Sequence, residues 1–391
     1  MPACNGARQG EPVSGAPTRF QRFILPGLAF KAAVIGGGYA TGRELAEYFI
    51  PSGPQGGMLA ILTAMICWSL VCALTFALAH ATRSLDYRSF FAVLLGPFAF
   101  LFELAYLVFM VLILAVFGAA AGEIFAAQSG WPTLAGTLLL MAGIGAFTAF
   151  GNDTVEALFK WVSVFLYGIY ALFVLIVLAG FGDRAFATLA TPQPTTGWLQ
   201  GGLTYAGYNI VGAVIVLPLV RHFLSQRDAI VAGVLSGPLA MLPGLLFFVC
   251  MLAWYPQIGQ EALPSDYILR QLDMPVFHLL FQLMIFSALL ESGTAVIHAS
   301  NERIAGAWHA RRGAVLTKTW RLGVAALLLT GSIFIADRVG LVALIAQGYR
   351  GLAYLFLVVY VLPLFTLGVW RLWRPPRPAA SPDPMPEGDS A

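Results

Sequence analysis

The sequence contains very little charge. Only 10% of its 391 residues are Asp, Glu, Lys or Arg, whereas 59% are hydrophobic. A soluble domain is charged at about a quarter of its positions, so this chain cannot bury its apolar surface in a water-exposed globule. Its apolar stretches run for about 20 residues without the polar–apolar alternation of barrel strands. The sequence therefore predicts an all-α integral membrane protein.

Several other features are also missing. The four cysteines suggest no disulfide framework, because three of them lie inside apolar stretches. No basic patch with interleaved aromatic residues points to nucleic acid. The chain has no GxSxG, HExxH or Walker A motif, and no histidine pair with metal-ligand spacing. We therefore expect neither an enzyme nor a cofactor, and no bound metal beyond a coupling Na⁺.

Ten apolar stretches predict ten membrane spans. They lie near 22–50, 57–80, 92–126, 132–150, 154–181, 200–221, 228–254, 274–300, 317–336 and 341–373. The third and tenth are long, which predicts tilt or a short extra helix. Lys and Arg gather before the first span, after the second, sixth and tenth, and between the eighth and ninth. The positive-inside rule then places both termini in the cytoplasm and the chain in the cytoplasmic (inner) membrane.

The order of the spans predicts two five-span repeats, 22–181 and 200–373, joined by an extracellular loop at 182–199. Residues 154–167 resemble 341–354, and the first and sixth spans are both interrupted by small and polar residues. Because five is odd, the second unit enters the membrane from the opposite side, as in many secondary transporters. Residues 1–21 form a cytoplasmic segment, and the Pro-rich tail 374–391 is expected to be disordered. The sequence leaves open whether 338–373 is one helix or two.

The stretch VIGGGYATGRELAEYF, residues 34–49, interrupts the first span with glycine. Irregular backbone inside a membrane survives only where it is buried in protein or lines a cavity. An opened helix there would offer N–H groups to a carboxylate and carbonyls to a cation or an ammonium group. The alternative is that the glycines only allow close helix packing. A matching break at Ala206–Gly207 in the sixth span favours a binding site.

These residues resemble a known family. GGGYATGRELAEYF (36–49) is similar to the first-span signature of the YkvI-like amino acid permeases, approximately Gly-Ala-Gly-Phe-Ala-Ser-Gly-Gln-Glu followed by an aromatic pair. YAGYNIVGAVIVLPL (205–219) resembles their sixth-span Tyr-x-x-Tyr-Asn stretch, and LLESGTAVIH (289–298) their eighth span. The chain departs at Arg43, where the family has Gln. The resemblance implies the amino acid–polyamine–cation superfamily, the leucine-transporter fold and coupling to an ion gradient.

The interrupted middles of the first and sixth spans are the predicted binding site for the solute. Tyr106 of the third span joins them, because the fold implies substrate contact there; a role in the core is the alternative. The expected solute contacts are Gly36, Gly37, Gly38, Tyr39, Ala40, Thr41, Tyr106, Tyr205, Ala206, Gly207, Tyr208 and Asn209.

Ionisable residues inside the bilayer are expensive and usually functional. Glu291 lies in the middle of the eighth span, where it serves a coupling cation or pairs with a buried base. Lys160 of the fifth span stands where proton-coupled relatives carry a lysine, or it snorkels to the membrane face. The resemblance also implies a cation site built from eighth-span hydroxyls and first-span carbonyls. Its expected members are Ile35, Gly38, Ser287, Glu291, Ser292 and Thr294.

Arg43 is a candidate for an outer gate, closing against Glu123 or Glu291; a surface ion pair is the alternative. Together these features predict a secondary active transporter of a small amino-acid-like solute, an amino acid or a related amine. Na⁺ or H⁺ would drive it while spans 1, 2, 6 and 7 rock against spans 3, 4, 8 and 9. A ligand-sensing membrane subunit of the same fold, which binds without transporting, is the first rival, and a channel is the second. The solute, the coupling ion, the direction and the oligomeric state stay open.

Overall fold

The structure, a computed structural model, describes residues 17–34, 37–150, 152–313 and 317–373. This described part consists of helices and their connections, without strands. Seven of its helical stretches are long and apolar enough to cross a membrane, and Thr133–Ala149 is a shorter apolar helix. The prediction of an all-α membrane protein is confirmed, whereas the count of ten spans stays a prediction. Residues 1–16, the tail 374–391, Ile35 and Gly36 lie outside the described residues.

The first half of the chain begins with a span made of short pieces. A π-helical turn at Phe20–Ile24 leads into α1 (Leu25–Val34), α2 (Gly37–Ala40) and α3 (Arg43–Tyr48). The following helices are longer. They are α4 (Gly53–Thr82), α5 (Tyr87–Leu95), α6 (Phe100–Ser129), α7 (Thr133–Phe150) and α8 (Asn152–Ala190). The predicted third stretch, 92–126, contains only the last four residues of the short helix α5; a 3₁₀ turn at Gly96–Ala99 and α6 make up the rest.

The second half starts with α9 (Trp198–Asn209) and α10 (Val211–Ile215), followed by a 3₁₀ turn at Leu217–His222. The next helices are α11 (Gln226–Leu252), α12 (Pro264–Leu272), α13 (Pro275–Arg312) and α14 (Lys318–Val339). A 3₁₀ turn at Gln257–Gln260 precedes α12. From 341 to 373 the backbone is one helical stretch, in which π-helical turns alternate with α15 (Leu341–Ala343), α16 (Arg350–Phe356) and α17 (Val369–Trp373). This answers the question that the sequence left open.

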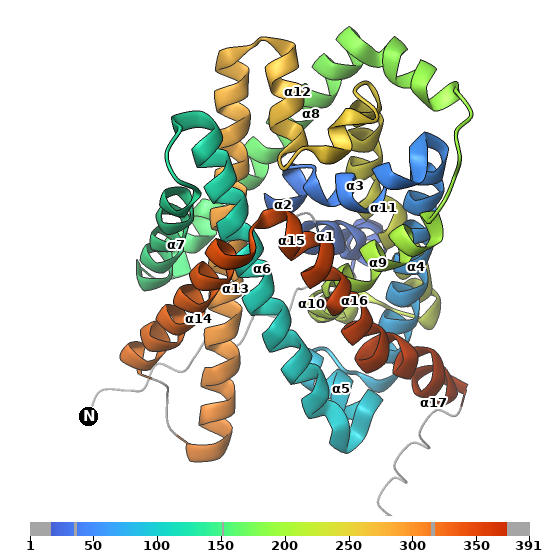
Figure 1. Cartoon of the computed structure of the whole chain (residues 1–391). Coiled ribbons are helices and arrows are strands. Elements are labelled where there is room, and N and C mark those ends of the chain that lie inside the picture. Colours follow the sequence, from blue (N-terminus) through green and yellow to red (C-terminus); the bar gives the residue numbers. More distant parts are fainter. Residues whose placement is uncertain (1–16, 35–36, 151, 314–316, 374–391) are drawn as a thin grey trace, which may run out of the picture.

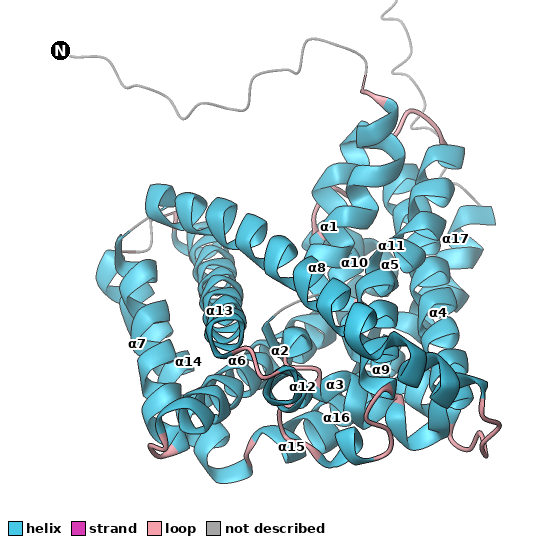
Figure 2. Cartoon of the chain, turned by 90° about the horizontal axis from the view of Figure 1, so that it is seen from above, coloured by secondary structure: helices cyan, strands magenta, loops and turns pink. Residues whose placement is uncertain are grey.

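The helices form two groups. Helices α1, α4, α9, α10 and α11 pack on one another, and α6, α7, α13 and α14 form a second group. Seen from above, the groups lie on opposite sides and α8 runs between them (Figure 2). Helix α8 contacts both groups, through α11 and α13. At opposite ends of the molecule lie α12 and α5 (Figure 1), and we call these the α12 end and the α5 end.

Small residues bring helices of the first group into close contact. A Cβ atom at Gly233 of α11 would lie 2.3 Å from both the N and the Cα of Ala73 in α4. At Gly237, one turn further, it would lie 2.2 Å from the carbonyl oxygen of Met65. Without a side chain at these positions the two backbones pack directly, which replaces the hydrophobic driving force that helices lack inside lipid.

The two interrupted spans differ from one another. In the first span α1 ends at Val34, α2 begins at Gly37, and Gly42, with φ +78°, separates α2 from α3. That φ lies in the left-handed region, which glycine adopts without steric cost. The sixth span is interrupted as predicted, but between α9, which ends at Asn209, and α10, which begins at Val211; the predicted position at Ala206–Gly207 is wrong, since α9 runs through both residues.

Packing explains why Gly207 stays helical. A Cβ there would lie 2.9 Å from the Cβ and 3.2 Å from the Cα of Ala353 in α16. The carbonyl of Ala206 accepts a hydrogen bond from Trp68 Nε1 at 3.2 Å. These small residues therefore let α9 approach its neighbours closely, which is the alternative that the sequence left for such glycines.

Candidate substrate-binding cavity

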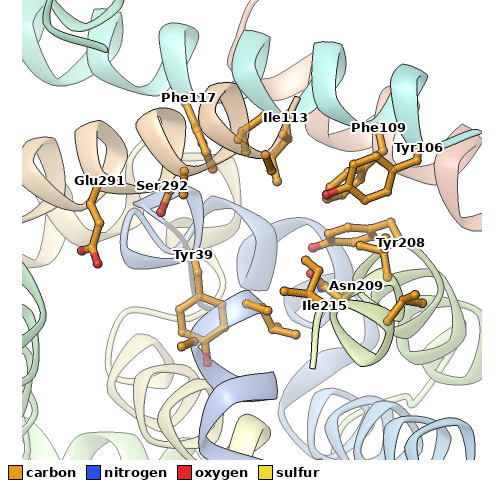
Figure 3. Close-up of a pocket in the computed structure, with 18 of the residues that line it drawn as sticks. Tyr39, Tyr106, Phe109, Ile113, Phe117, Tyr208, Asn209, Ile215, Glu291 and Ser292 are labelled. Carbon is orange, nitrogen blue, oxygen red and sulfur yellow. The ribbon is translucent and has the colours of Figure 1, made fainter. Parts of the chain in front are cut away.

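A cavity of about 450 Å³ lies between the two helix groups. Its volume is in the range of small-molecule sites. Side chains from α1, α2, α3, α6, α8, α9, α10 and α13 form the wall. Four of the twelve residues predicted to contact the solute and two of the six predicted to form the cation site lie on this wall, and Figure 3 labels all of them. The predicted residues on the wall are Tyr39, Tyr106, Tyr208, Asn209, Glu291 and Ser292.

The centre of the cavity is rich in tyrosine. The carboxylate of Glu44, which is 5% exposed, accepts a hydrogen bond from the hydroxyl of Tyr208. The ring of Tyr208 stacks on that of Tyr349, with centroids 4.3 Å apart. The hydroxyl of Tyr39 is buried and has no hydrogen-bond partner in the described chain. This hydroxyl faces α11, where a Cβ at Gly244 would lie only 2.1 Å from it, so the unpaired group is directed into the helix packing.

Sequence reasoning assigned no role to Glu44. One signal could have found it: an acidic residue stands two positions after Gly42, where the interrupted first span resumes as α3. What the sequence could not show is that Arg43, its direct neighbour, turns away from the cavity. Only the tertiary structure separates the two charges.

An arginine lies at the α5 end of the cavity. The guanidinium of Arg303 lies over the rings of Tyr106 and Tyr87, at 3.5 and 3.8 Å from their centroids. Its backbone carbonyl accepts a hydrogen bond from Arg88 Nη2 at 2.9 Å. The two contacts with the rings are cation–π interactions. Together with the hydrogen bond from Arg88, they join α13 to α6 and α5.

Asp86 also lines this end of the cavity and begins α5. Burial raises the pKa of its carboxyl, but hydrogen bonds from the Ser89 side chain and from the backbone N–H groups of Ser89 and Arg88 lower it, and the pKa ends below its usual value. Asp86 is therefore ionised at neutral pH and acts as the N-terminal cap of α5.

At the α12 end, Arg43 joins α3 to the segment before α12. Its Nη1 donates to the carbonyls of Gly259 and Glu261, at 3.0 and 2.9 Å, and its Nη2 pairs with Glu47 at 2.5 Å. The backbone N–H of Ser265 adds a hydrogen bond to the Thr41 carbonyl at 3.0 Å. The gate role of Arg43 stays a prediction.

The partners predicted for Arg43 are wrong. The sequence suggested Glu123 or Glu291, whereas the guanidinium binds Glu47 of its own helix and the segment before α12. Charge alone suggested the acidic partners. The structure shows instead that Nη1 donates to two carbonyls of an irregular segment, which no sequence pattern predicts.

Only some of the residues predicted to form the cation site lie at the cavity. Glu291 and Ser292 lie on the cavity wall, and α2, which carries Gly37 and Gly38, packs against α13. Ser287 and Thr294 do not line the cavity: each hydroxyl donates at 2.7 Å to a carbonyl of α13 itself, that of Leu283 or Leu290. Such bonds to the preceding turn satisfy hydroxyls inside helices.

Other predicted site residues lie off the wall. Tyr205 is buried in an aromatic core, with ring centroids 4.8 Å from Phe49 and 5.5 Å from Trp68. Ala40 and Thr41 are buried where α2 ends. Ala206 and Gly207 face α4 and α16 instead of the cavity. The side chain of Lys160 lies outside the described residues, as do Ile35 and Gly36.

A first span in pieces, two helix groups and one cavity between them define the leucine-transporter fold, and the fold prediction is confirmed. The chain is similar to MhsT, solved in complex with L-phenylalanine, with a TM-score of 0.54, 14% identity, and coverage of 92% of this chain and 99% of that one. The chain is also similar to Mhp1 in an inward-facing conformation, with a TM-score of 0.49 and 17% identity. This match covers 91% of this chain and 81% of Mhp1.

The predicted sequence resemblance is confirmed as well. The chain is 25% identical over 267 residues to YkvI, an uncharacterised membrane protein of Bacillus subtilis (strain 168), which covers 67% of this chain and 75% of YkvI. No family model matches the sequence. The similar solved structures are transporters and not enzymes, in agreement with the prediction that this chain is not an enzyme.

Proposed function

We propose that this protein is a secondary active transporter that carries a small amino-acid-like solute across the cytoplasmic membrane. The observation that supports this most directly is the position of the cavity, which lies between two helix groups beside the interrupted first span. Such a site at the interface of two groups is what alternating access requires, because movement of one group against the other changes the side that is open.

The two ends of the molecule differ in this conformation. The α12 end is closed by Arg43 and the Thr41–Ser265 hydrogen bond, whereas the cavity extends to Asp86 and Arg303 at the α5 end. The orientation that the positive-inside rule predicts would make the α5 end cytoplasmic. In that orientation the cavity serves the cytoplasmic side in this conformation, and the helix groups of spans 1, 2, 6 and 7 and of spans 3, 4, 8 and 9 rock against each other.

Coupling to Na⁺ or H⁺ is part of the proposal. Glu291 and Ser292 on the cavity wall are its candidates, together with the backbone around Gly38. A carboxylate within the membrane region supports a role in cation or proton movement, because an intramembrane charge is retained mainly where it has a function. The solute is small, an amino acid or a related amine, in keeping with a cavity of about 450 Å³.

Uptake into proteoliposomes tests the proposal. The purified protein is reconstituted, and each L-amino acid is supplied with a Na⁺ gradient, with a pH gradient, or with neither. We expect uptake of at least one amino acid that requires one of the two gradients. Binding without uptake under any gradient would favour the ligand-sensing alternative, and a unitary conductance would favour a channel.

A further inference from the structure

Buried charges in this molecule have partners of opposite charge, with one exception. In the described chain four side chains of Asp, Glu, Lys or Arg are buried: Arg43, Glu44, Asp228 and Asp266. Three of them form ion pairs. The pairs are Arg43–Glu47 at 2.5 Å, Asp228–Arg22 at 2.7 Å and Asp266–Arg270 at 3.1 Å.

Glu44 is the exception. Its carboxylate meets the neutral hydroxyl of Tyr208, and the described chain places no basic group within ion-pair distance of it. The neighbouring guanidinium of Arg43 is directed to Glu47 and to two backbone carbonyls. Glu44 also belongs to the cavity wall, so a molecule in the cavity can reach it.

A buried carboxylate without a positive partner is unfavourable by several kcal/mol. Proteins neutralise such a group with a proton, a metal ion or a paired cation. Because the described chain supplies no cation to Glu44, the ligand is the natural source. The missing counter-charge is therefore a property that the ligand should have.

The surroundings of Glu44 indicate which kind of cation fits. Hard metal ions bind through several oxygen ligands at once. Around this cavity the wall is mainly aromatic and aliphatic, and Tyr208, whose hydroxyl is bonded to Glu44, stacks on Tyr349. Aromatic faces attract organic ammonium groups, and the volume of about 450 Å³ has room for the rest of an organic molecule.

We propose that Glu44 binds the ammonium group of the solute, so that the cavity selects primary amines and amino acids over neutral or anionic molecules. The inference rests on the proposed function, whose site it specifies. Tyr208 donates to one carboxylate oxygen, Oε2, and so fixes the orientation in which the carboxylate meets the ammonium group. The remainder of the solute then lies among the rings of Tyr106 and Phe109.

The test uses three probes with one carbon skeleton: L-leucine, 3-methylbutylamine and 4-methylpentanoate. The first carries both charges, the second only the ammonium group and the third only the carboxylate. Binding to the purified full-length protein in detergent is measured by calorimetry and by thermal shift, in NaCl and in KCl. We expect the amine to bind, and the carboxylate to bind at least tenfold more weakly than the amine.

Variants at Glu44 test whether this residue binds the ammonium group. Glu44→Gln should weaken amine binding on the order of thirtyfold or more, because it removes one partner of a buried charge pair. Glu44→Asp retains the charge and should retain the preference for amine over carboxylate, which keeps the test valid if the Gln variant does not fold. Glu123→Gln on α6, a carboxylate off the cavity wall, is the matched control and should bind within about threefold of wild type.

Three results would overturn the inference. The first is amine binding by Glu44→Gln as tight as by wild type. The second is no binding of either ammonium probe to the wild type. The third is a stabilisation specific to Na⁺ that disappears in Glu44→Gln while amines have no effect, which would assign the carboxylate to an inorganic cation. Amine binding that depends on Glu44 without uptake in proteoliposomes would support the inference and reject the transport proposal.

Discussion

Replacing Arg43 by alanine removes the contacts that join α3 to the segment before α12. The guanidinium is 5% exposed and forms two hydrogen bonds to backbone carbonyls, of Gly259 and Glu261, together with the ion pair to Glu47. We predict that Arg43→Ala weakens the closure of the α12 end and shifts the protein toward conformations that are open there.

The size of the shift follows from the bonds that are lost. A hydrogen bond to a charged group contributes about 1.5–3 kcal/mol, and breaking a buried ion pair costs about 3–5 kcal/mol. Glu47 is 19% exposed, so water can solvate the carboxylate that is left behind, and the cost falls toward the lower values. About 3 kcal/mol in favour of opening corresponds to roughly a hundredfold change in the ratio of open to closed states.

Hydrogen exchange followed by mass spectrometry measures this opening. The amides of 257–272 belong to the segment that Arg43 holds, and that of Ser265 is bonded to the Thr41 carbonyl. Exchange reports the free energy of local opening, so these amides should exchange on the order of a hundredfold faster in Arg43→Ala. Amides in the middle of α6 should keep their wild-type rates.

Arg270→Ala is the matched control. This arginine lies on α12 itself, pairs with Asp266 at 3.1 Å and with Glu261 at 3.9 Å, and is 58% exposed. An exposed ion pair contributes at most about 1 kcal/mol, so exchange should change less than about tenfold. Equal exchange in Arg43→Ala and wild type, or equal effects of the two variants, would refute the view that the buried guanidinium closes this end.

Three further predictions concern helix packing, a buried hydroxyl and coupling. Gly233→Ala should destabilise the protein by about 3 kcal/mol or more, because the new Cβ would meet the Ala73 backbone. Gly180→Ala, at a position in open space, should change stability by less than about 1 kcal/mol. Equal thermal midpoints of the two variants would contradict this. Tyr39→Phe should leave the melting temperature unchanged or higher, because the hydroxyl has no partner in the described chain and lies against Gly244 of α11; a lower thermal midpoint would contradict this. Glu291→Gln should alter the cation or pH dependence of uptake more than the solute preference, and an unchanged dependence would remove Glu291 from coupling.

The sequence by itself determined the class of protein. Scarcity of charge and apolar stretches of sufficient length require helices in a membrane, because unsatisfied backbone groups are too costly in hydrocarbon. Glycine in the first span indicated the interruption there, and Gly42 with its positive φ lies in it. Tyr39, Tyr106, Tyr208 and Asn209 were found because they stand in or opposite the interrupted spans.

The sequence pattern was misleading in the sixth span, because glycine in a membrane helix has two uses. Glycine permits an opened backbone, and it also permits close packing. Gly207 serves packing, since its Cα faces Ala353 of α16, a residue far away in the sequence. The sequence contains the glycine but not the identity of its neighbour, and so the break in the sixth span was placed too early.

Only the tertiary structure decided how the charges are paired. Arg43 and Glu44 are adjacent in the sequence, yet the guanidinium binds carbonyls before α12 and the carboxylate turns to Tyr208 and the cavity. Whether a buried charge is neutralised depends on side chains and carbonyls that the fold brings from distant positions. Composition and periodicity are properties of one segment, whereas a counter-charge, or its absence, is a property of how segments meet.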